Sequence, residues 1–149
     1  MYKHELKIKK HKKVSHFTYG RYGSTTTIEL ENILKELEQA YHVFLTGTGF
    51  GGIALALMAL CRPGDEILVS DNVYGPTKEI SQELMKEFKV DAKFYNPDSL
   101  DDLKRKISHK TKMILVENPG SNTFEFQDLS QIVKVAKRKK IFTLLDNTW

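Results

Sequence analysis

The sequence of 149 residues predicts an α/β protein with three layers, in which helices cover both faces of a mostly parallel sheet. Short, continuous apolar runs alternate with segments of helical periodicity from residue 43 onward. Such runs are typical of interior strands in parallel sheets, because these strands are buried on both faces. The alternation is regular and contains no internal repeat or low-complexity linker, which favours one continuous α/β architecture.

Two helices and one strand are expected within residues 26–60. Thr26-x-x-Glu29 reads as a capping box, in which each of the two side chains accepts a hydrogen bond from the other residue's backbone N–H. The helix that follows carries an apolar stripe, which predicts a buried face. A buried strand is expected at 43–46, followed by a helix over 50–60 that is apolar on most sides and should be fully buried. The stripe of the first helix consists of Leu30, Ile33, Leu34, Leu37 and Tyr41.

Strands and helices continue to alternate after a stop signal at Pro63-Gly64-Asp65. Continuous apolar runs predict strands at 67–69, 92–95, 113–116 and 141–145. Helical spacing predicts helices over 80–88, over 100–107 with Asp98 or Ser99 as the cap, and over 129–136. Residues 1–18 show no such period, so they are expected to form a basic arm outside the domain that spans 19–149.

Composition and charge exclude several classes of protein. A hydrophobic fraction of 40% with a net charge of +4 excludes a disordered chain. No apolar run reaches the length of a membrane span, and the charged start lacks the apolar region of a signal peptide. We therefore expect a soluble, cytoplasmic protein with no membrane partner. Cys61 is the single cysteine, which excludes an internal disulfide, and its apolar neighbours predict a buried, unreactive thiol.

Two basic runs contain most of the excess positive charge. Because no aromatic residues alternate with the second run, it lacks a base-stacking surface, and it is expected on the solvated side of a helix end. We therefore expect no nucleic-acid partner and no metal site. The runs consist of Lys3, Lys7, Lys9, Lys10, Lys12 and Lys13, and of Lys134, Lys137, Arg138, Lys139 and Lys140.

The glycine-rich turn at 47–52 predicts an anion site. Glycines let backbone N–H groups approach a ligand, and the positive end of the next helix favours a phosphate. The turn also spells G-x-G-x-x-G, and Asp71 follows Gly52 by 19 positions, near where a ribose-binding acid belongs in dinucleotide-binding proteins. A tight turn that only packs a helix on the sheet is the alternative interpretation.

Polar residues follow three of the apolar runs, and the loop after the first of these lies where open α/β sheets place ligands. Tyr74 lies in the loop after the 67–69 run, the loop 117–122 follows the next interior run, and Asp146 and Thr148 come after the last one. Near the start of the chain, Arg21 lies between tyrosines and glycines, and its planar guanidinium group is suited to a phosphate or a carboxylate. A dinucleotide site gives most of these residues no common purpose.

Together these residues resemble the pyridoxal-phosphate (PLP) enzymes of cysteine and methionine metabolism, most closely the cystathionine beta-lyases. Five motifs occur in the family's order over residues 17–149: Tyr19-Gly20-Arg21, Thr48-Gly49-Phe50-Gly51, Val73-Tyr74-Gly75, Glu117-Asn118-Pro119-Gly120-Ser121 and Asp146-Asn147-Thr148-Trp149. The resemblance implies the large domain of fold type I, the aspartate-aminotransferase-like PLP enzymes. It also implies an α,β-elimination that converts cystathionine to homocysteine, pyruvate and ammonia.

The resemblance assigns a role to each candidate cofactor-binding residue. The backbone N–H groups of Gly49 and Phe50 would bind the phosphate, and Tyr74 would stack on the pyridine ring. Asp146 would pair with the ring nitrogen, supported by Thr148. Ser121 stands where relatives place an Asn near the phenolic oxygen. Tyr19 and Arg21 would reach the phosphate of a neighbouring subunit, which implies an oligomer.

The family's Schiff-base lysine lies beyond the Asp-Asn-Thr motif, and no lysine of this sequence matches it. No catalytic residue is therefore assigned, and the chain is expected to be a truncated large domain without lyase activity of its own. A companion chain carrying the remaining part, or a homo-oligomer, is the expected partner, with cystathionine or a related amino acid as substrate. A gamma-lyase or gamma-synthase of the same family, and a non-catalytic remnant or dinucleotide-binding domain, remain as alternatives.

Overall fold

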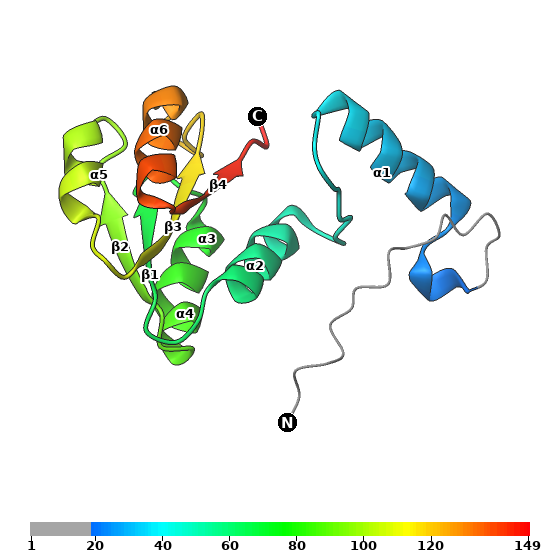
Figure 1. Ribbon diagram of the computed structural model, residues 1–149, viewed down its shortest axis with the longest axis horizontal. Coiled ribbons are helices and arrows are strands. Elements are labelled where there is room, and N and C mark those ends of the chain that lie inside the picture. The colour runs from blue at the N-terminus through cyan, green and yellow to red at the C-terminus, as the bar shows by residue number, and fades with distance from the viewer. Residues whose placement is uncertain (1–18) are drawn as a thin grey trace. The chain divides into compact units, whose positions relative to one another are not determined.

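The computed structural model describes residues 19–149, and the chain divides into two compact units, Met1–Leu45 and Thr46–Trp149. The second unit contains the β-sheet and the loops at its carboxyl edge (Figure 1). The arm predicted at 1–18, with the first basic run, lies outside the described residues.

Four strands form the sheet: β1 (Glu66–Ser70), β2 (Asp91–Tyr95), β3 (Thr111–Glu117) and β4 (Phe142–Asp146). They are ordered β2-β1-β3-β4, and every neighbouring pair is parallel. All four had been predicted from short apolar runs. β1 and β3 are the interior strands, and nearly all their residues are buried, as a strand covered on both faces requires.

Helices cover both faces of this sheet, which confirms the predicted three-layer architecture (Figure 1). On one face lie α2 (Gly49–Leu60) and a continuous helical segment formed by α3 (Gly75–Glu79), the π-helical turn η2 (Ile80–Leu84) and α4 (Met85–Glu87). On the other face lie α5 (Leu100–Lys106) and α6 (Leu129–Lys139). Since side chains alternate along a strand, Ile67 and Val69 belong to the first core and Leu68 to the second.

The predicted full burial of the helix over 50–60 is wrong. In α2, Ile53 and Leu57 are buried, whereas Leu55 and Met58 are about half exposed. A helix that packs on a sheet buries only the stripe that contacts it, whatever the composition of its other sides. Cys61, at the end of α2, is buried as predicted, and burial raises the pKa of its thiol.

The predicted strand at 43–46 is also absent. These residues form no strand within the described part of the chain, and Phe44 is 74% exposed. A strand needs a neighbour that accepts and donates its backbone hydrogen bonds, and a short apolar run does not identify that neighbour. Apolar content alone therefore predicted the wrong local structure here.

In the first unit, η1 (Gly20–Tyr22) precedes α1 (Thr25–Leu37), whose predicted capping box is displaced by two residues. Ser24 is the N-cap: its hydroxyl accepts from the Thr27 N–H at 3.1 Å, and the Thr27 hydroxyl oxygen accepts from the Ser24 N–H at 2.6 Å. In a run of Ser and Thr, several positions offer the same cap chemistry. The predicted burial of the α1 stripe is wrong, since no residue of α1 is buried and Leu37 is 72% exposed.

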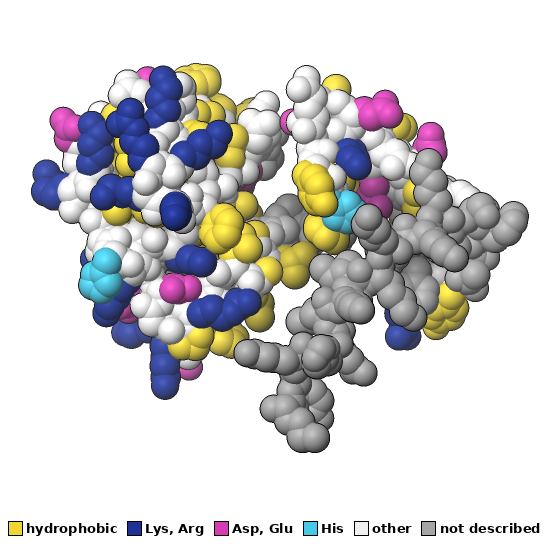
Figure 2. All heavy atoms as spheres, viewed as in Figure 1, with side chains coloured by type: hydrophobic (Ala, Val, Ile, Leu, Met, Phe, Trp, Pro, Cys, Tyr) yellow, Lys and Arg dark blue, Asp and Glu magenta, His cyan; other side chains and the backbone are white. Residues whose placement is uncertain are grey.

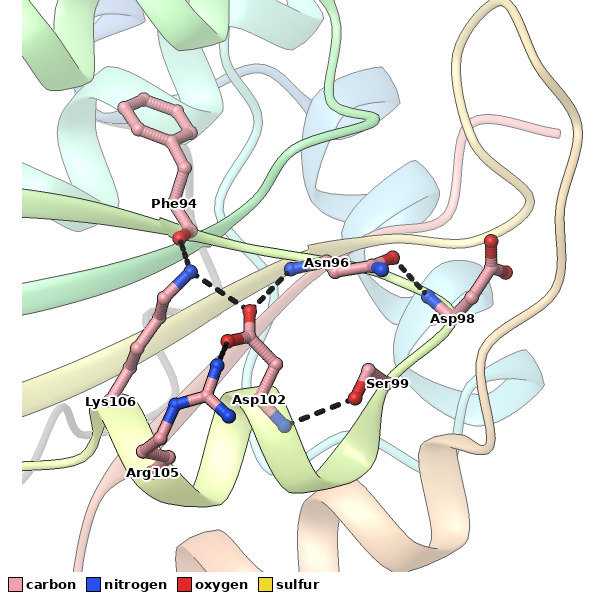
Figure 3. A network of polar contacts seen from close by, with 7 residues as sticks. All are labelled: Phe94, Asn96, Asp98, Ser99, Asp102, Arg105 and Lys106. Carbon is pink, nitrogen blue, oxygen red and sulfur yellow. Dashed lines mark hydrogen bonds and ion pairs between the residues drawn. The ribbon is translucent and has the colours of Figure 1, made fainter.

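The turn between β2 and α5 is held by a buried carboxylate. Ser99 caps α5, which decides between the two caps that the sequence allowed. Asp102 Oδ2 accepts hydrogen bonds from the Asn96 N–H at 2.9 Å and from Lys106 Nζ at 2.8 Å, and its Oδ1 pairs with Arg105 (Figure 3). These bonds, the one from Lys106 above all, lower the pKa of Asp102. The network joins helix and strand and leaves no group of Asp102 free for a ligand.

Basic side chains cluster over α5 and α6, as the dark blue surface in Figure 2 shows. Lys137, Arg138 and Lys139 form the last turn of α6 and are exposed, as predicted for a solvated helix end. Cations at this position are favoured by the partial negative charge of the helix C-terminus. In the described part of the chain, no helix combines the length and the apolar character needed to cross a membrane.

Glu66 gives a first testable prediction, on stability against pH. It is 4% exposed and pairs with Lys93, and its Oε1 accepts from Thr111 Oγ1 at 2.7 Å and Ser108 Oγ at 3.0 Å. Burial raises its pKa, but the hydrogen bonds from Lys93, Thr111 and Ser108 outweigh burial and lower it below 4.5. Glu66 therefore stabilises the fold at neutral pH, and this contribution disappears as pH falls through the folded-state pKa.

Glu66→Gln is accordingly expected to cost about 1–2 kcal/mol at pH 7, because it removes the charge from three hydrogen bonds. Urea unfolding at several pH values measures the difference between the two proteins. The difference should shrink below pH 4.5, where the native carboxylate also becomes protonated. A difference that stays constant from pH 7 to pH 3 would contradict this assignment.

Candidate functional site

The carboxyl ends of β1 and β3 lie at a topological switch point of the sheet. From β1 the chain turns to β2 on one side, and β3 then pairs with β1 on the other side. The loops that leave β1 and β3 therefore diverge over opposite faces of the sheet, and open α/β sheets bind ligands where such loops separate. Tyr74 lies in the first loop and Ser121 in the second, so both predicted residues belong to this edge.

A hydrogen bond joins the two loops directly. The Tyr74 N–H donates to Glu117 Oε2 at 2.7 Å, across 43 residues of sequence. Tyr74 precedes α3 as its N-cap residue, and its ring is 49% exposed, while Glu117 ends β3 and is 4% exposed. The ring of Tyr74 thus faces outward from a backbone that is tied to the sheet.

Ser121 lies in the same cluster. Its N–H donates to the carbonyl of Asn72 at 2.9 Å, and its hydroxyl hydrogen-bonds the Glu117 carboxylate. Gly120 precedes it, and a Cβ there would lie 2.4 Å from Asn72 Nδ2 and 2.9 Å from Glu125 Oε2. The loop therefore passes too close to its neighbours for any residue larger than glycine without a shift of those side chains.

Asp146 and Thr148 complete this edge of the sheet. Asp146 ends β4 and is paired in register with Glu117, and its carbonyl accepts from the Asn118 N–H at 3.3 Å. Asp146 Oδ1 accepts from both the N–H (3.1 Å) and the hydroxyl (2.5 Å) of Thr148. Both of these bonds end on Oδ1, which orients the carboxylate and leaves Oδ2 for a further donor. Thr148 thus supports Asp146, as the family resemblance implies.

Two carboxylates share this edge. Burial, and to a smaller extent the charge of Asp146, raise the pKa of Glu117. Hydrogen bonds from the Tyr74 amide and the Ser121 hydroxyl oppose this effect, but the net pKa is raised. A cation near Asp146 would relieve the repulsion between the two groups. The donor set is therefore suited to a ligand with a positively charged N–H and an aromatic face, which are the features of a protonated pyridine ring.

Gly49 and Phe50 are the first two residues of α2, as predicted. The Thr48 hydroxyl caps the helix by accepting from the Gly51 N–H at 2.9 Å. The amides of Gly49 and Phe50 have no acceptor inside the helix, because the first turn of any α-helix lacks them. A Cβ on Gly49 would meet no atom within 4 Å, so the space beside its Cα is open. No hydrogen bond between described residues links these amides to the Tyr74–Asp146 cluster.

Tyr19 and Arg21 lie in the first unit, at the start and within η1. The Arg21 guanidinium carbon is 5.7 Å from the centre of the Tyr19 ring, a cation–π distance. The two residues thus form a pair with each other within the first unit.

Gln127 is a residue of this edge that the sequence analysis missed. It is 7% exposed and precedes α6. Its Nε2 donates to Ser70 Oγ at 2.9 Å and to the Glu117 carbonyl at 3.2 Å, and its Oε1 accepts from the Tyr95 hydroxyl at 2.8 Å. Polar residues at the ends of buried strands, such as Ser70 and Tyr95, were the available signal that a buried partner was needed.

The dinucleotide alternative finds little support at Asp71. Asp71 Oδ1 forms an ion pair with Lys78 Nζ at 2.5 Å, so a cation already occupies the acid that a ribose would need. The glycine turn also does not follow a strand, which the dinucleotide fingerprint requires.

Comparisons with known proteins point to one family. A family model described as "Cys/Met metabolism PLP-dependent enzyme" matches residues 1–149. A putative cystathionine beta-lyase of Saccharomyces cerevisiae is 41% identical over 131 residues, which cover 88% of this chain and 38% of the relative. The chain thus spans about two fifths of that relative's length.

Solved structures of PLP enzymes share the fold. A putative O-acetylhomoserine (thiol)-lyase of Campylobacter jejuni, which contains N′-pyridoxyl-lysine-5′-monophosphate, matches with a TM-score of 0.81 and 28% identity over 87% of this chain and 32% of its own. The cystathionine gamma-lyase of Lactobacillus plantarum, complexed with L-serine, matches with a TM-score of 0.84 and 25% sequence identity. This match covers 92% of this chain and 36% of the gamma-lyase chain. The sheet and its helices therefore have the fold type I architecture that the sequence predicted.

Proposed function

Since the chain belongs to the Cys/Met metabolism PLP-dependent enzyme family, we propose that its second unit binds pyridoxal phosphate at the carboxyl edge of the sheet. The main support is the convergence of Tyr74, Ser121 and Asp146 at the ends of β1, β3 and β4, where Glu117 links their loops. The fit is chemical, because an aromatic face, an oriented carboxylate and open helix amides match the ring, its nitrogen and the phosphate.

Each residue has a separate task in this proposal. Gly49 and Phe50 offer backbone N–H groups to the phosphate, and Tyr74 stacks on the ring. Asp146 Oδ2 accepts from the ring N–H while Thr148 holds Oδ1, and Ser121 lies near the phenolic oxygen. When bound, PLP supplies an electron sink for the bond that breaks at the substrate α-carbon. Asp146 maintains the positive charge on the ring nitrogen, on which that property depends.

For the reaction, we propose carbon–sulfur bond cleavage, and specifically α,β-elimination of cystathionine to homocysteine, pyruvate and ammonia. Identity to a putative cystathionine beta-lyase supports this choice. Likeness to a gamma-lyase structure keeps γ-elimination as a second candidate. The two are separated by their keto-acid products, pyruvate against 2-oxobutanoate. Because the chain covers little more than a third of these relatives, its own contribution is proposed to be cofactor binding.

An oligomer, or a companion chain carrying the remaining part of the family's fold, is proposed as partner. Tyr19 and Arg21 are placed in the family at a neighbouring subunit's phosphate. In addition, β4 forms an edge of the described sheet, with Phe142 45% exposed and Leu145 38% exposed. Apolar residues on an open edge favour association. Light scattering at increasing concentration should therefore give a mass above that of the 17.1 kDa chain if the partner is a second copy, and a constant monomer mass would contradict self-association.

The cofactor proposal is tested by binding of pyridoxine 5′-phosphate to the 149-residue chain. This alcohol form lacks the aldehyde that would react with surface lysines, so its binding reports the pocket alone. Ligand fluorescence titration is expected to give a saturable Kd for the unaltered chain. Tyr74→Ala and Asp146→Ala should each weaken binding about tenfold, the size expected from losing a ring contact or a charge-assisted hydrogen bond.

Asp71→Ala is the control. Asp71 also follows β1, but it belongs to the dinucleotide alternative, so its loss should leave pyridoxine phosphate binding unchanged. An NAD titration tests that alternative directly. Failure of the unaltered chain to bind pyridoxine phosphate, or equal weakening by Asp71→Ala, would contradict the proposal.

A further inference from the structure

We propose that Glu117 is a positioning residue that holds the Tyr74 backbone, and with it the Tyr74 ring, in place for the cofactor. This inference rests on the proposed function, because it assumes that Tyr74 stacks on the pyridine ring. It assigns a task to the buried carboxylate that the cofactor-binding residues leave unexplained.

The hydrogen bond to Glu117 gives the Tyr74 N–H an acceptor that α3 does not provide. Tyr74 is the N-cap residue of α3, and its N–H points away from the helical hydrogen-bond ladder. No side chain caps this end of α3. Glu117 Oε2, at 2.7 Å, supplies the acceptor from another strand. Tyr74, the last residue of the loop before α3, is thereby tied to the sheet.

Glu117 is held in place by its strand and by hydrogen bonds around it. It ends the interior strand β3, and its carbonyl accepts from Gln127 Nε2 at 3.2 Å. The next residue, Asn118, donates its N–H to the Asp146 carbonyl. The side chain is 4% exposed, whereas the ring of Tyr74 is 49% exposed. The position of an open aromatic ring is thus set by a buried group on the scaffold, which is how precise sites are generally supported.

Charge gives this contact a distinctive signature. Burial and the Asp146 carboxylate raise the pKa of Glu117, and the Tyr74 amide and the Ser121 hydroxyl lower it, with a net raised value. A comparable hydrogen bond joins the Asn96 N–H, which follows β2, to the buried carboxylate of Asp102 in α5. The pKa of Asp102 is lowered, chiefly by Lys106. The two amides should therefore report titrations on opposite sides of the ordinary carboxyl range.

The first experiment follows these amides by ¹⁵N–¹H NMR while pH is varied. The Tyr74 resonance is expected to move with a midpoint above 4.5, and the Asn96 resonance with a midpoint below 3.8. In Glu117→Gln the Tyr74 titration should vanish, because the amide side chain accepts the same bond without titrating, while the Asn96 titration is unchanged. Persistence of the Tyr74 titration in Glu117→Gln would overturn the proposal.

The second experiment measures pyridoxine 5′-phosphate binding by the same variants. Glu117→Gln keeps an acceptor for the Tyr74 N–H and should bind within about twofold of the unaltered chain. Glu117→Leu leaves that N–H unpaired, so binding should weaken about tenfold and the Tyr74 amide should exchange faster with solvent. Equal affinity of Glu117→Leu and the unaltered chain would overturn the positioning role, as would equal weakening by Glu117→Gln.

The two failures are distinguishable. If the unaltered chain does not bind pyridoxine phosphate, the proposed function fails, and the Tyr74 titration still decides whether Glu117 holds this backbone. If Glu117→Leu does not fold, as judged by circular dichroism, the Glu117→Gln titration and the binding of that variant decide the question.

Discussion

Replacement of Leu57 by alanine is expected to lower the free energy of unfolding by about 2–5 kcal/mol, because it empties a fully buried site. Leu57 lies on the sheet-facing side of α2 and has no exposed surface. It belongs to the core cluster that also contains Val69 of β1 and Leu115 of β3. Neighbours on a rigid sheet cannot collapse fully into the space that the side chain leaves, so a cavity cost adds to the lost burial.

Leu55 offers a matched control on the same helix. It is 53% exposed, and Leu55→Ala removes the same atoms from a position that already contacts water. Its cost should stay below about 1 kcal/mol, since alanine also has the better helix propensity. Urea unfolding followed by circular dichroism measures both variants. Equal losses for the two would mean that α2 does not dock through the Leu57 face.

The sheet was predictable from sequence because its strands carry their own signal. Leu68 and Ile114 lie in runs that are apolar on both faces, which only an interior parallel strand requires. The cap of α5 was also predicted from a local signal, with Asp98 and Ser99 as the two candidates. In the structure the Ser99 hydroxyl accepts from the Asp102 N–H. Patterns with a local cause were therefore reliable in this chain.

The failures have a non-local cause. The stripe of α1 and the apolar run at 43–46 predict that something covers them, but not which element does so. Leu37 and Phe44 are both largely exposed. The same limit applies to α2, where composition did not reveal that a single face meets the sheet. Apolar periodicity specifies a surface that needs a partner, and the partner depends on tertiary structure.

At the candidate site, the sequence predicted positions better than contacts. Tyr74 was located by the rule that ligands bind at the carboxyl ends of parallel strands, whereas Ser121 and Asp146 were located by the family's motifs. In the structure all three follow or end strands at the same edge of the sheet. The bond from the Tyr74 amide to Glu117 spans 43 residues and follows no periodicity. Gln127 was missed for the same reason, because no spacing rule indicates a buried glutamine that joins three strands.

Gln127→Leu is expected to destabilise the fold by about 2–4 kcal/mol, although leucine has a similar volume and is more apolar. The substitution leaves the buried Tyr95 hydroxyl, Ser70 and the Glu117 carbonyl without the partner that now joins them. Burial raises the pKa of Tyr95, so its phenol stays protonated and remains a donor in need of an acceptor. Gln131→Leu, on the exposed side of α6, is the control and should change stability by less than about 0.5 kcal/mol.

A double variant separates lost bonds from lost packing. An unpaired buried donor costs more than the removal of both partners, because only the former leaves a desolvated group unsatisfied. Tyr95→Phe added to Gln127→Leu should therefore cost less than the sum of the two single variants, with a coupling of about 1 kcal/mol in urea unfolding. Strict additivity would mean that the hydroxyl of Tyr95 and the amide of Gln127 do not share a stabilising hydrogen bond.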